Sequence, residues 1–223
     1  MYQDIADSLD NGDRIDAIIV DFSKAYDLVP HGRLLTKIAN SGTDPRVVVW
    51  IREFLSGCMQ RVRVEGQLSE VRVMSGVPQG SVLGSLLFLA YINDIGRNTE
   101  STIRLFADDC VIYRKILNND DMEKLQKDVD RMGELADVNS MKINPSKNKA
   151  ICFMKARVKG PLNYLLMGTL IPEVSSCKYL EIILRSDLSW VDQVNYKVKK
   201  AWKALHFIMR ILKYEVCLKS IRP

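Results

Sequence analysis

Three aspartates interrupt apolar runs of this chain at places where a carboxylate is costly. Asp21 follows Ile18-Ile19-Val20, and Asp108 and Asp109 separate two further apolar runs. Short runs rich in β-branched residues are typical of buried strands. A carboxylate at the end of a buried strand is unfavourable unless it is paired, hydrogen-bonded or bound to a metal ion. The sequence therefore predicts strands whose ends carry acidic groups that need a partner.

Two interpretations of these carboxylates stay open at this point. An isolated Asp-Asp pair most often marks a hairpin turn, and Asp108-Asp109 fits that pattern. A third carboxylate on another strand favours a metal site instead, because clustered like charges repel each other unless a divalent cation is present, and hard oxygen ligands suit Mg²⁺. Two such ions about 3.5–4 Å apart activate an attacking oxygen and stabilise a leaving phosphate oxygen. The second interpretation points to nucleotidyl transfer.

Hydrophobic periodicity and turn residues predict irregularly alternating helices and strands. Helices are expected over 30–41, from 45 to the residue before Gly57, and over 82–95, 119–139 and 190–213. Strands are expected over 16–22, 59–64, 69–74, 102–106, 110–114 and 149–154, with strand-like segments at 162–171 and 177–184. The residues Ala107-Asp108-Asp109 are expected to form a turn. This order, interrupted by hairpins, favours an α+β fold over a doubly wound parallel sheet.

The charge is unevenly distributed along the 223 residues. Residues 1–140 carry a net charge of −6 and residues 141–223 a net charge of +11. Such asymmetry suggests a nucleic-acid or membrane partner for the basic part, and a solvated basic surface is the alternative. The predicted C-terminal helix combines an apolar stripe, expected to lie in the core, with four lysines expected at the surface: Lys197, Lys199, Lys200 and Lys203.

Composition narrows the class of protein further. No window reaches 18 uncharged apolar residues, so a membrane span is not expected, and the N-terminus lacks the pattern of a secretory signal. The five cysteines are spread singly, with no pair at C-x-x-C spacing, which indicates free thiols rather than a zinc site or a disulfide framework. Free thiols are typical of a reducing, intracellular compartment.

Three motifs stand in order along the chain: Asp21-Phe22-Ser23-Lys24-Ala25-Tyr26-Asp27, Ser75-Gly76-Val77-Pro78-Gln79-Gly80-Ser81-Val82-Leu83-Gly84, and Phe106-Ala107-Asp108-Asp109. Together they resemble the signatures of reverse transcriptases, most closely those of jockey-like non-LTR retrotransposons. The resemblance continues through 144–147 and 178–180, so that it extends over nearly the whole chain.

The resemblance implies an α+β right-hand polymerase palm, an antiparallel sheet backed by helices, over residues 1–184. The start of a helical thumb is implied over 185–223. The fingers segments that precede the first motif in relatives are largely missing, so the chain is expected to be truncated at both ends.

The activity implied is RNA-directed DNA polymerase, in which a primer 3′-hydroxyl attacks a deoxynucleoside triphosphate along an RNA template. The partners implied are therefore an RNA template, a DNA primer and deoxynucleoside triphosphates, with no membrane. The family analogy indicates the nucleus, with the cytoplasm as the other intracellular location, and the oligomeric state is left open. The alternative function is a catalytically inactive relic that keeps only RNA or hybrid-duplex binding.

The same resemblance implies the catalytic groups. Asp21 and Asp108 are expected to hold two Mg²⁺ ions, for which Mn²⁺ is a substitute, with Asp109 as a less direct ligand. The backbone carbonyl of Phe22 is a further expected metal contact. Lys147 is expected to neutralise charge or donate a proton near the leaving pyrophosphate, with Lys149 as its rival.

The substrate contacts are also implied by the resemblance. Tyr26 is expected to exclude a ribose 2′-hydroxyl as a steric gate, and a core aromatic is the alternative. A loop expected to lie against the incoming nucleotide and the template base comprises Pro78, Gln79 and Gly80, for which a plain β-turn is the alternative. The four lysines of the C-terminal helix are expected to contact the primer–template backbone.

Three positions depart from the family pattern. Ser85 replaces the usual proline, and Asn148 replaces the common threonine. Glu181 stands where glycine is usual, at a tight hairpin expected near the primer end. A side chain at that position distorts the turn if the backbone needs a positive φ.

Overall fold

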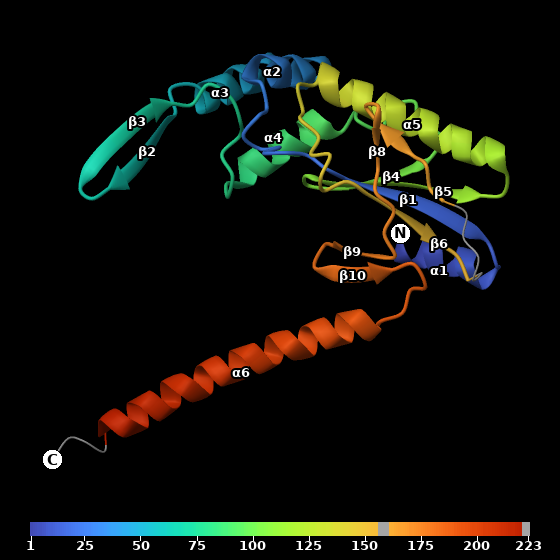
Figure 1. Ribbon diagram of the computed structural model, residues 1–223. Coiled ribbons are helices and arrows are strands. Elements are labelled where there is room, and N and C mark those ends of the chain that lie inside the picture. Colours follow the sequence, from blue (N-terminus) through green and yellow to red (C-terminus); the bar gives the residue numbers. More distant parts are fainter. Residues whose placement is uncertain (156–160, 220–223) are drawn as a thin grey trace. The chain divides into compact units, whose positions relative to one another are not determined.

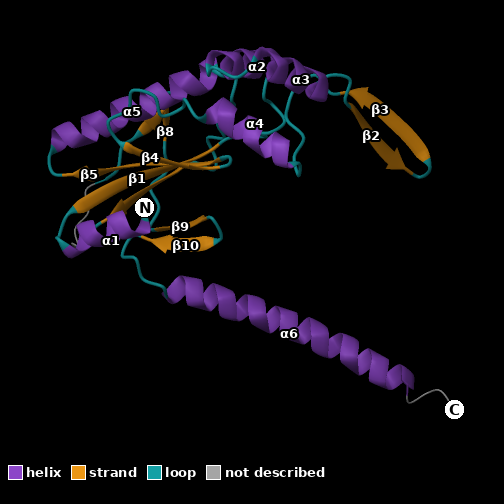
Figure 2. Cartoon of the chain, turned by 180° about the vertical axis from the view of Figure 1, so that it is seen from behind, coloured by secondary structure: helices purple, strands orange, loops and turns teal. Residues whose placement is uncertain are grey.

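The computed structural model describes residues 1–155 and 161–219 (Figures 1 and 2). The chain divides into two compact units, Met1–Val174 and Ser175–Pro223. The predicted boundary between palm and thumb, after residue 184, lies inside the second unit and stays a prediction.

A four-stranded antiparallel sheet organises the first unit. Its strands lie in the order β4 (Thr102–Phe106), β5 (Asp109–Ile116), β1 (Arg14–Asp21) and β6 (Lys149–Phe153). The central strand β1 pairs with β5 along its whole length and with β6 from Ile15 to Ile19. Both edges and both faces of β1 are covered, which suits its apolar run Ala17–Val20.

Helices cover both faces of this sheet, as both views show (Figures 1 and 2). On one face lie α2 (His31–Asn40), α4 (Val82–Ile92) and α5 (Asn119–Val138), and α3 (Pro45–Leu55) follows beside α2. The main core forms there, around Ile18 and Val20 of β1 and Met132 of α5. On the opposite face the short helix α1 (Tyr2–Asp10) buries Ile5 and Leu9. The predicted α+β palm, an antiparallel sheet backed by helices, is confirmed.

Local sequence signals explain where the helices start. The side chain of Asp44 accepts a hydrogen bond from the Arg46 backbone N–H, with Pro45 at the first helical position of α3. Ser81 caps α4 by accepting from the Gly84 N–H at 2.9 Å, and Asn118 caps α5. None of the helices in the described part of the chain is both long and apolar enough to cross a membrane.

Two hairpins of the first unit differ slightly from the prediction. Strands β2 (Met59–Val64) and β3 (Gln67–Arg72) pair around the predicted turn Glu65-Gly66, but β3 begins two residues before the expected start. The strand-like segment 162–171 is a short hairpin, β7 (Leu165–Leu166) with β8 (Thr169–Leu170), rather than one strand. The reason is that Met167 and Gly168 both adopt a positive φ, which turns the chain back on itself.

The second unit contains one hairpin and one long helix. Strands β9 (Ser176–Tyr179) and β10 (Ile182–Arg185) enclose the turn Leu180-Glu181, and α6 (Val191–Lys219) follows. The apolar stripe of α6 was predicted to lie in the core, and this is wrong for the described residues. Its members are exposed, with Trp202 at 56% and Leu205 at 48%. Within this unit α6 packs against β10, and the buried Gln193 in its first turn accepts a hydrogen bond from the Ile183 N–H at 3.0 Å.

Candidate active site

The strand register brings two of the three aspartates face to face. Asp21 of β1 lies directly opposite Asp109 of β5, and Phe106 of β4 lies opposite Asp109 in turn. The backbone N–H and C=O of Asp21 form their hydrogen bonds on the side away from β5, so Asp21 and Asp109 are a non-hydrogen-bonded pair. The α-carbons of such pairs are about 4.5 Å apart and their side chains lie close together on one face. The sheet therefore presents a row of Phe106, Asp109 and Asp21.

Asp108 lies beside this row in a tight turn. The hairpin β4–β5 turns through two residues, Ala107 and Asp108. Asp109 was expected in the turn but is the first residue of β5. Ala107 has a φ of 53°, a conformation that costs a residue with a side chain about 1–2 kcal/mol. Strain of this kind is often found where a turn must hold a functional group in place.

At the row, the negative charges of two neighbouring carboxylates act on Asp109 against the positive charge of Lys147. Burial raises the pKa of the Asp109 carboxyl, and the negative charges of Asp108 and Asp21 raise it further, against a smaller opposing effect of Lys147. The Lys147 ammonium lies 3.3 Å from both carboxylate oxygens of Asp21 but donates a hydrogen bond only to Oδ1. The buried oxygen Oδ2 of Asp21 has no hydrogen-bond donor. An additional cation beside these carboxylates would offset their mutual repulsion and give the Oδ2 of Asp21 a partner.

The donor groups at the row fit a divalent cation. Across the described residues, no three His, Cys, Asp or Glu side chains are assembled into a ready-made metal cluster. The facing carboxylates, the orphaned oxygen of Asp21 and the neighbouring Asp108 nevertheless form a set of hard oxygen donors. Phe22 adds its backbone carbonyl. The antiparallel bridge between Phe22 and Ile143 is hydrogen-bonded through the residues that flank them, so it does not use the Phe22 carbonyl. Mg²⁺ needs only one or two carboxylates and completes its shell with water and substrate oxygens.

Lys147 is brought to this site and Lys149 is placed elsewhere. Lys147 is exposed on the loop before β6 and reaches Asp21 across that loop. Lys149 is the first residue of β6, opposite Ile19 of β1. The geometry therefore supports Lys147 over its rival, and its role in proton transfer stays a prediction.

Asn148 is a residue that the sequence reasoning noted only as a departure from the family pattern. It is 3% exposed, and its side-chain oxygen accepts a hydrogen bond from the Asp21 backbone N–H at 3.2 Å. A polar residue directly before a buried strand is the only signal of this contact in the sequence.

The loop before α4 is tied to the segment that follows Asp21. The Val77 N–H donates to the Tyr26 carbonyl at 2.8 Å, and the Gly76 N–H donates to the Val29 carbonyl at 2.8 Å. Gly76 has a φ of +90°, and a Cβ built on it would lie 2.8 Å from the Asp27 carbonyl oxygen, so only glycine fits there. These contacts fix the start of the loop Pro78-Gln79-Gly80 relative to the β1 end.

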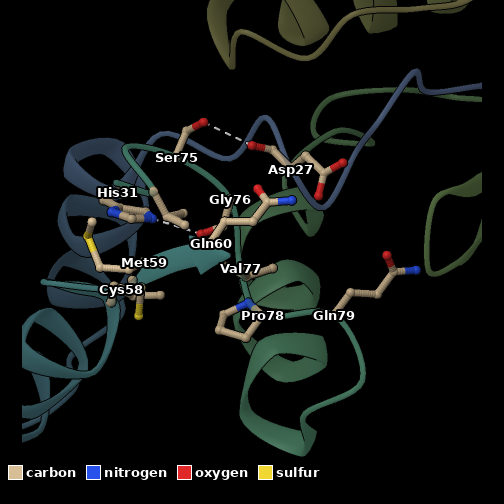
Figure 3. Close-up of a pocket in the computed structure, with 12 residues that line it drawn as sticks. Asp27, His31, Cys58, Met59, Gln60, Ser75, Gly76, Val77, Pro78 and Gln79 are labelled. Carbon is tan, nitrogen blue, oxygen red and sulfur yellow. Dashed lines mark hydrogen bonds between the residues drawn. The ribbon is translucent and has the colours of Figure 1, made fainter. Parts of the chain in front are cut away.

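A pocket of about 470 Å³ opens beside this loop (Figure 3). His31, Cys58 and Met59 line one side, and the His31 ring nitrogen Nε2 contacts the Gly76 carbonyl at 2.7 Å. Gln79 stands at the other side, with its side-chain amide apart from these groups, and is exposed. Pro78 and Gly80 are exposed as well. The loop is thus free to meet a ligand, and the nucleotide contact stays a prediction.

Tyr26 was considered as a steric gate or as a core aromatic, and its position is compatible with both. Its ring stacks on Phe88 of α4, with the ring centroids 4.3 Å apart and the planes at 21°, so part of the side chain belongs to the core. The residue is only half-buried and lies five positions after Asp21. The stacking gives the ring a fixed position, and its function as a steric gate stays a prediction.

The four lysines of α6 are all exposed. At about 100° per residue they fall within an arc of about 160°, opposite Val198, Trp202 and Leu205 of the apolar stripe. In the same unit, Leu180 and Glu181 have φ values of 47° and 63°, so the hairpin needs the positive φ that glycine would supply. Glu181 is held by an ion pair with Lys178 at 2.6 Å.

Comparisons with known proteins agree with this geometry. The family described as "Reverse transcriptase (RNA-dependent DNA polymerase)" matches residues 9–184, which is most of the chain. The chain belongs to this family. It is 31% identical over 201 residues to the probable RNA-directed DNA polymerase from transposon X-element of Drosophila melanogaster, covering 87% of this chain and 22% of that protein. It is also 29% identical to the RNA-directed DNA polymerase from mobile element jockey of the same species, covering 82% of this chain and 21% of that protein.

Solved structures support the fold of this reverse transcriptase domain. The telomerase of Candida tropicalis, solved with a fragment of telomeric RNA, aligns with a TM-score of 0.57 at 13% identity, over 84% of this chain and 31% of that one. At this identity the likeness shows the fold alone. The chain spans about a fifth of the length of the curated relatives it matches. Reverse transcriptases generally depend on divalent metal ions.

Proposed function

We propose that this domain catalyses RNA-directed DNA synthesis, adding deoxynucleotides to a primer 3′-hydroxyl by two-metal nucleotidyl transfer. The observation that carries the proposal is the facing pair of Asp21 and Asp109, with Asp108 in the adjoining turn. Three carboxylates on one sheet edge are unfavourable in a palm without bound cations, and they suit the binding of metal–triphosphate complexes.

Asp21, Asp108 and Asp109, together with the Phe22 carbonyl, would hold two Mg²⁺ ions, with Mn²⁺ as a substitute. When bound, these ions activate the attacking hydroxyl and stabilise charge on the leaving phosphate oxygen. The strand register and the tight turn fix the carboxylates before any ligand arrives, so that catalysis comes mainly from positioning and electrostatics.

Lys147 and Tyr26 have complementary roles in the proposed reaction. The Lys147 ammonium is paired with Asp21, and it would neutralise charge at the leaving pyrophosphate or give it a proton. Tyr26, fixed against Phe88, would exclude a ribose 2′-hydroxyl and so select deoxynucleotides by repulsion. Gln79, between Pro78 and Gly80, would contact the incoming nucleotide and the template base.

The proposed nucleic-acid partners are an RNA template and a DNA primer. Their backbones would be contacted by the lysine arc of α6, which offers four positive charges on one side of a helix. By analogy with the family, we place this synthesis in the nucleus.

Primer extension tests the proposal. The chain is incubated with poly(rA)–oligo(dT), labelled dTTP and Mg²⁺, in parallel with Asp108→Ala and with Asp120→Ala as a matched control. Asp120 is an exposed aspartate in the first turn of α5, away from the carboxylate row. We expect incorporation by the parent chain and by Asp120→Ala and none by Asp108→Ala. Equal incorporation by Asp108→Ala, or none by a folded parent chain, contradicts the proposal.

A further inference from the structure

The hydrogen-bond ladder between β1 and β6 ends just before the catalytic carboxylate. Its last pair is Ile19 opposite Lys149. In an antiparallel ladder the next hydrogen-bonded pair would join Asp21 to Lys147, two residues further along each strand. The chain turns away instead, because the Lys147 N–H donates to the Asn144 carbonyl at 3.1 Å. Without a substitute, the N–H of Asp21 would have no partner on this side.

The side chain of Asn148 supplies that substitute. Its oxygen accepts the Asp21 N–H at 3.2 Å, where a strand carbonyl would otherwise stand. Asn148 is almost fully buried and the hydrogen bond is partly buried, so it is worth more than an exposed one. The side-chain amide thus extends the sheet by one hydrogen bond beyond the end of β6.

The same loop holds Asp21 at two more points. The Asn144 N–H donates to the Asp21 carbonyl at 2.9 Å, and the Lys147 ammonium pairs with the Asp21 carboxylate. The carbonyl and the carboxylate have donors of their own, and the N–H depends on Asn148 alone. A shift of the Asp21 backbone would move its carboxylate away from Asp109 on the neighbouring strand.

We propose that Asn148 is a positioning residue, which fixes the backbone of Asp21 so that its carboxylate stays beside that of Asp109, where the two would contribute to holding divalent metal. This inference rests on the proposed function, because it assumes that the row of carboxylates binds metal. Asn148 is not proposed to bind the metal or the substrate. It acts through Asp21, in the way that outer groups orient metal ligands and contribute to metal affinity.

A pair of isosteric substitutions separates the hydrogen bond from packing. Asn148→Thr keeps an acceptor oxygen on the side chain. Asn148→Val introduces a side chain of the same shape as threonine, but without an acceptor. Asn139→Ala is the control, because Asn139 is an equally buried asparagine, 4% exposed, at the end of α5. Asp21→Asn defines how much of the metal binding depends on the carboxylate row.

Two readouts are needed, and neither depends on polymerase activity. Amide hydrogen exchange of Asp21, followed by NMR without metal, reports the hydrogen bond. Titration with Mn²⁺, followed by calorimetry, reports the site. We expect Asn148→Val to speed Asp21 exchange and to weaken Mn²⁺ binding by about 10–100-fold, as for other lost outer-shell contacts. Asn148→Thr is expected to restore most of the protection and affinity, and Asn139→Ala to change neither.

The outcomes distinguish this inference from the proposed function. If Mn²⁺ binding is abolished by Asp21→Asn but is the same in Asn148→Val and Asn148→Thr, Asn148 has no positioning role and the metal site stands. A loss in Asn139→Ala equal to that in Asn148→Val assigns the effect to general destabilisation and also overturns the inference. If the parent chain binds no Mn²⁺ through Asp21, both the inference and the metal site are wrong.

Discussion

Replacing Asp109 by asparagine is expected to stabilise the metal-free protein. Asp109 faces Asp21 across the strand pair, and its pKa is raised by burial and by the charges of Asp108 and Asp21. A raised folded-state pKa means that the protonated carboxyl favours folding. Its stabilising effect is complete at acidic pH, below the ordinary pKa of an aspartate, and is lost as the pH rises through the raised value. Asparagine has no such loss.

The size of the effect follows from the cross-strand geometry. Two unit charges about 5 Å apart repel each other by about 3 kcal/mol at an effective dielectric constant of about 20. Both side chains are only half-buried, and Lys147 offsets part of the repulsion, so we reduce the expected gain to about 1 kcal/mol, the upper range for cross-strand pairs. For a chain of this size, 1 kcal/mol corresponds to about 2–4 °C in Tm.

Thermal unfolding in EDTA, measured from acidic to neutral pH, is the assay. Asp109→Asn is expected to unfold at a higher temperature at pH 7, with the difference disappearing in acid. Asp121→Asn is the control with the opposite sign, because Asp121 accepts the Leu117 N–H and pairs with Arg114, which lowers its pKa. Added Mg²⁺ should stabilise the parent chain more than Asp109→Asn. An Asp109→Asn variant that is no more stable than the parent at pH 7 would refute the reasoning.

Three further outcomes are expected. The double change Leu180→Asn/Glu181→Gly, which suits a turn with two positive φ values, should slow amide exchange in β9 and β10 by stabilising the hairpin by about 1 kcal/mol; faster exchange would contradict this. Gly84→Ala should lower stability by about 1–3 kcal/mol in denaturant unfolding, because its Cβ would lie 2.1 Å from the Pro78 carbonyl oxygen, whereas Gly32→Ala, with open space, should not. Alanine substitutions are proposed in the α6 lysine arc, at Lys197, Lys199, Lys200 and Lys203. Each should reduce the slope of log affinity for duplex against log salt concentration by about one charge, and an unchanged slope in all four variants would exclude the arc from duplex binding.

The sequence predicted most elements because their local signals agree. Strand β1 is a β-branched apolar run, and α5 combines an Asn118 cap with a long amphipathic period, so β1 lies within two residues of its predicted bounds and α5 within one. Helix α1 was not predicted, since only Ile5 and Leu9 of its residues are buried, and packing against the sheet stabilises it. A pattern of two apolar residues among polar ones is too weak a signal by itself.

The details of the site depend on tertiary structure. Sequence placed Asp108 and Asp109 together in a turn, but the strand register decides that Asp109 faces Asp21. The contact of Asn148 with Asp21 joins residues 127 positions apart, which no local pattern encodes. Amphipathic periodicity likewise located the apolar stripe of α6 but did not predict its exposure, because periodicity shows which side is apolar and not what packs on it.

The central claim is that the facing carboxylates form a divalent-metal site, and a crystal soaked in Mn²⁺ tests it most directly. An anomalous difference map is predicted to show density between the carboxylates of Asp21 and Asp109, within coordination distance of both, and to lose it in Asp21→Asn crystals. A map from well-ordered parent crystals with no peak at this row, or with the same peak in Asp21→Asn, would contradict the account.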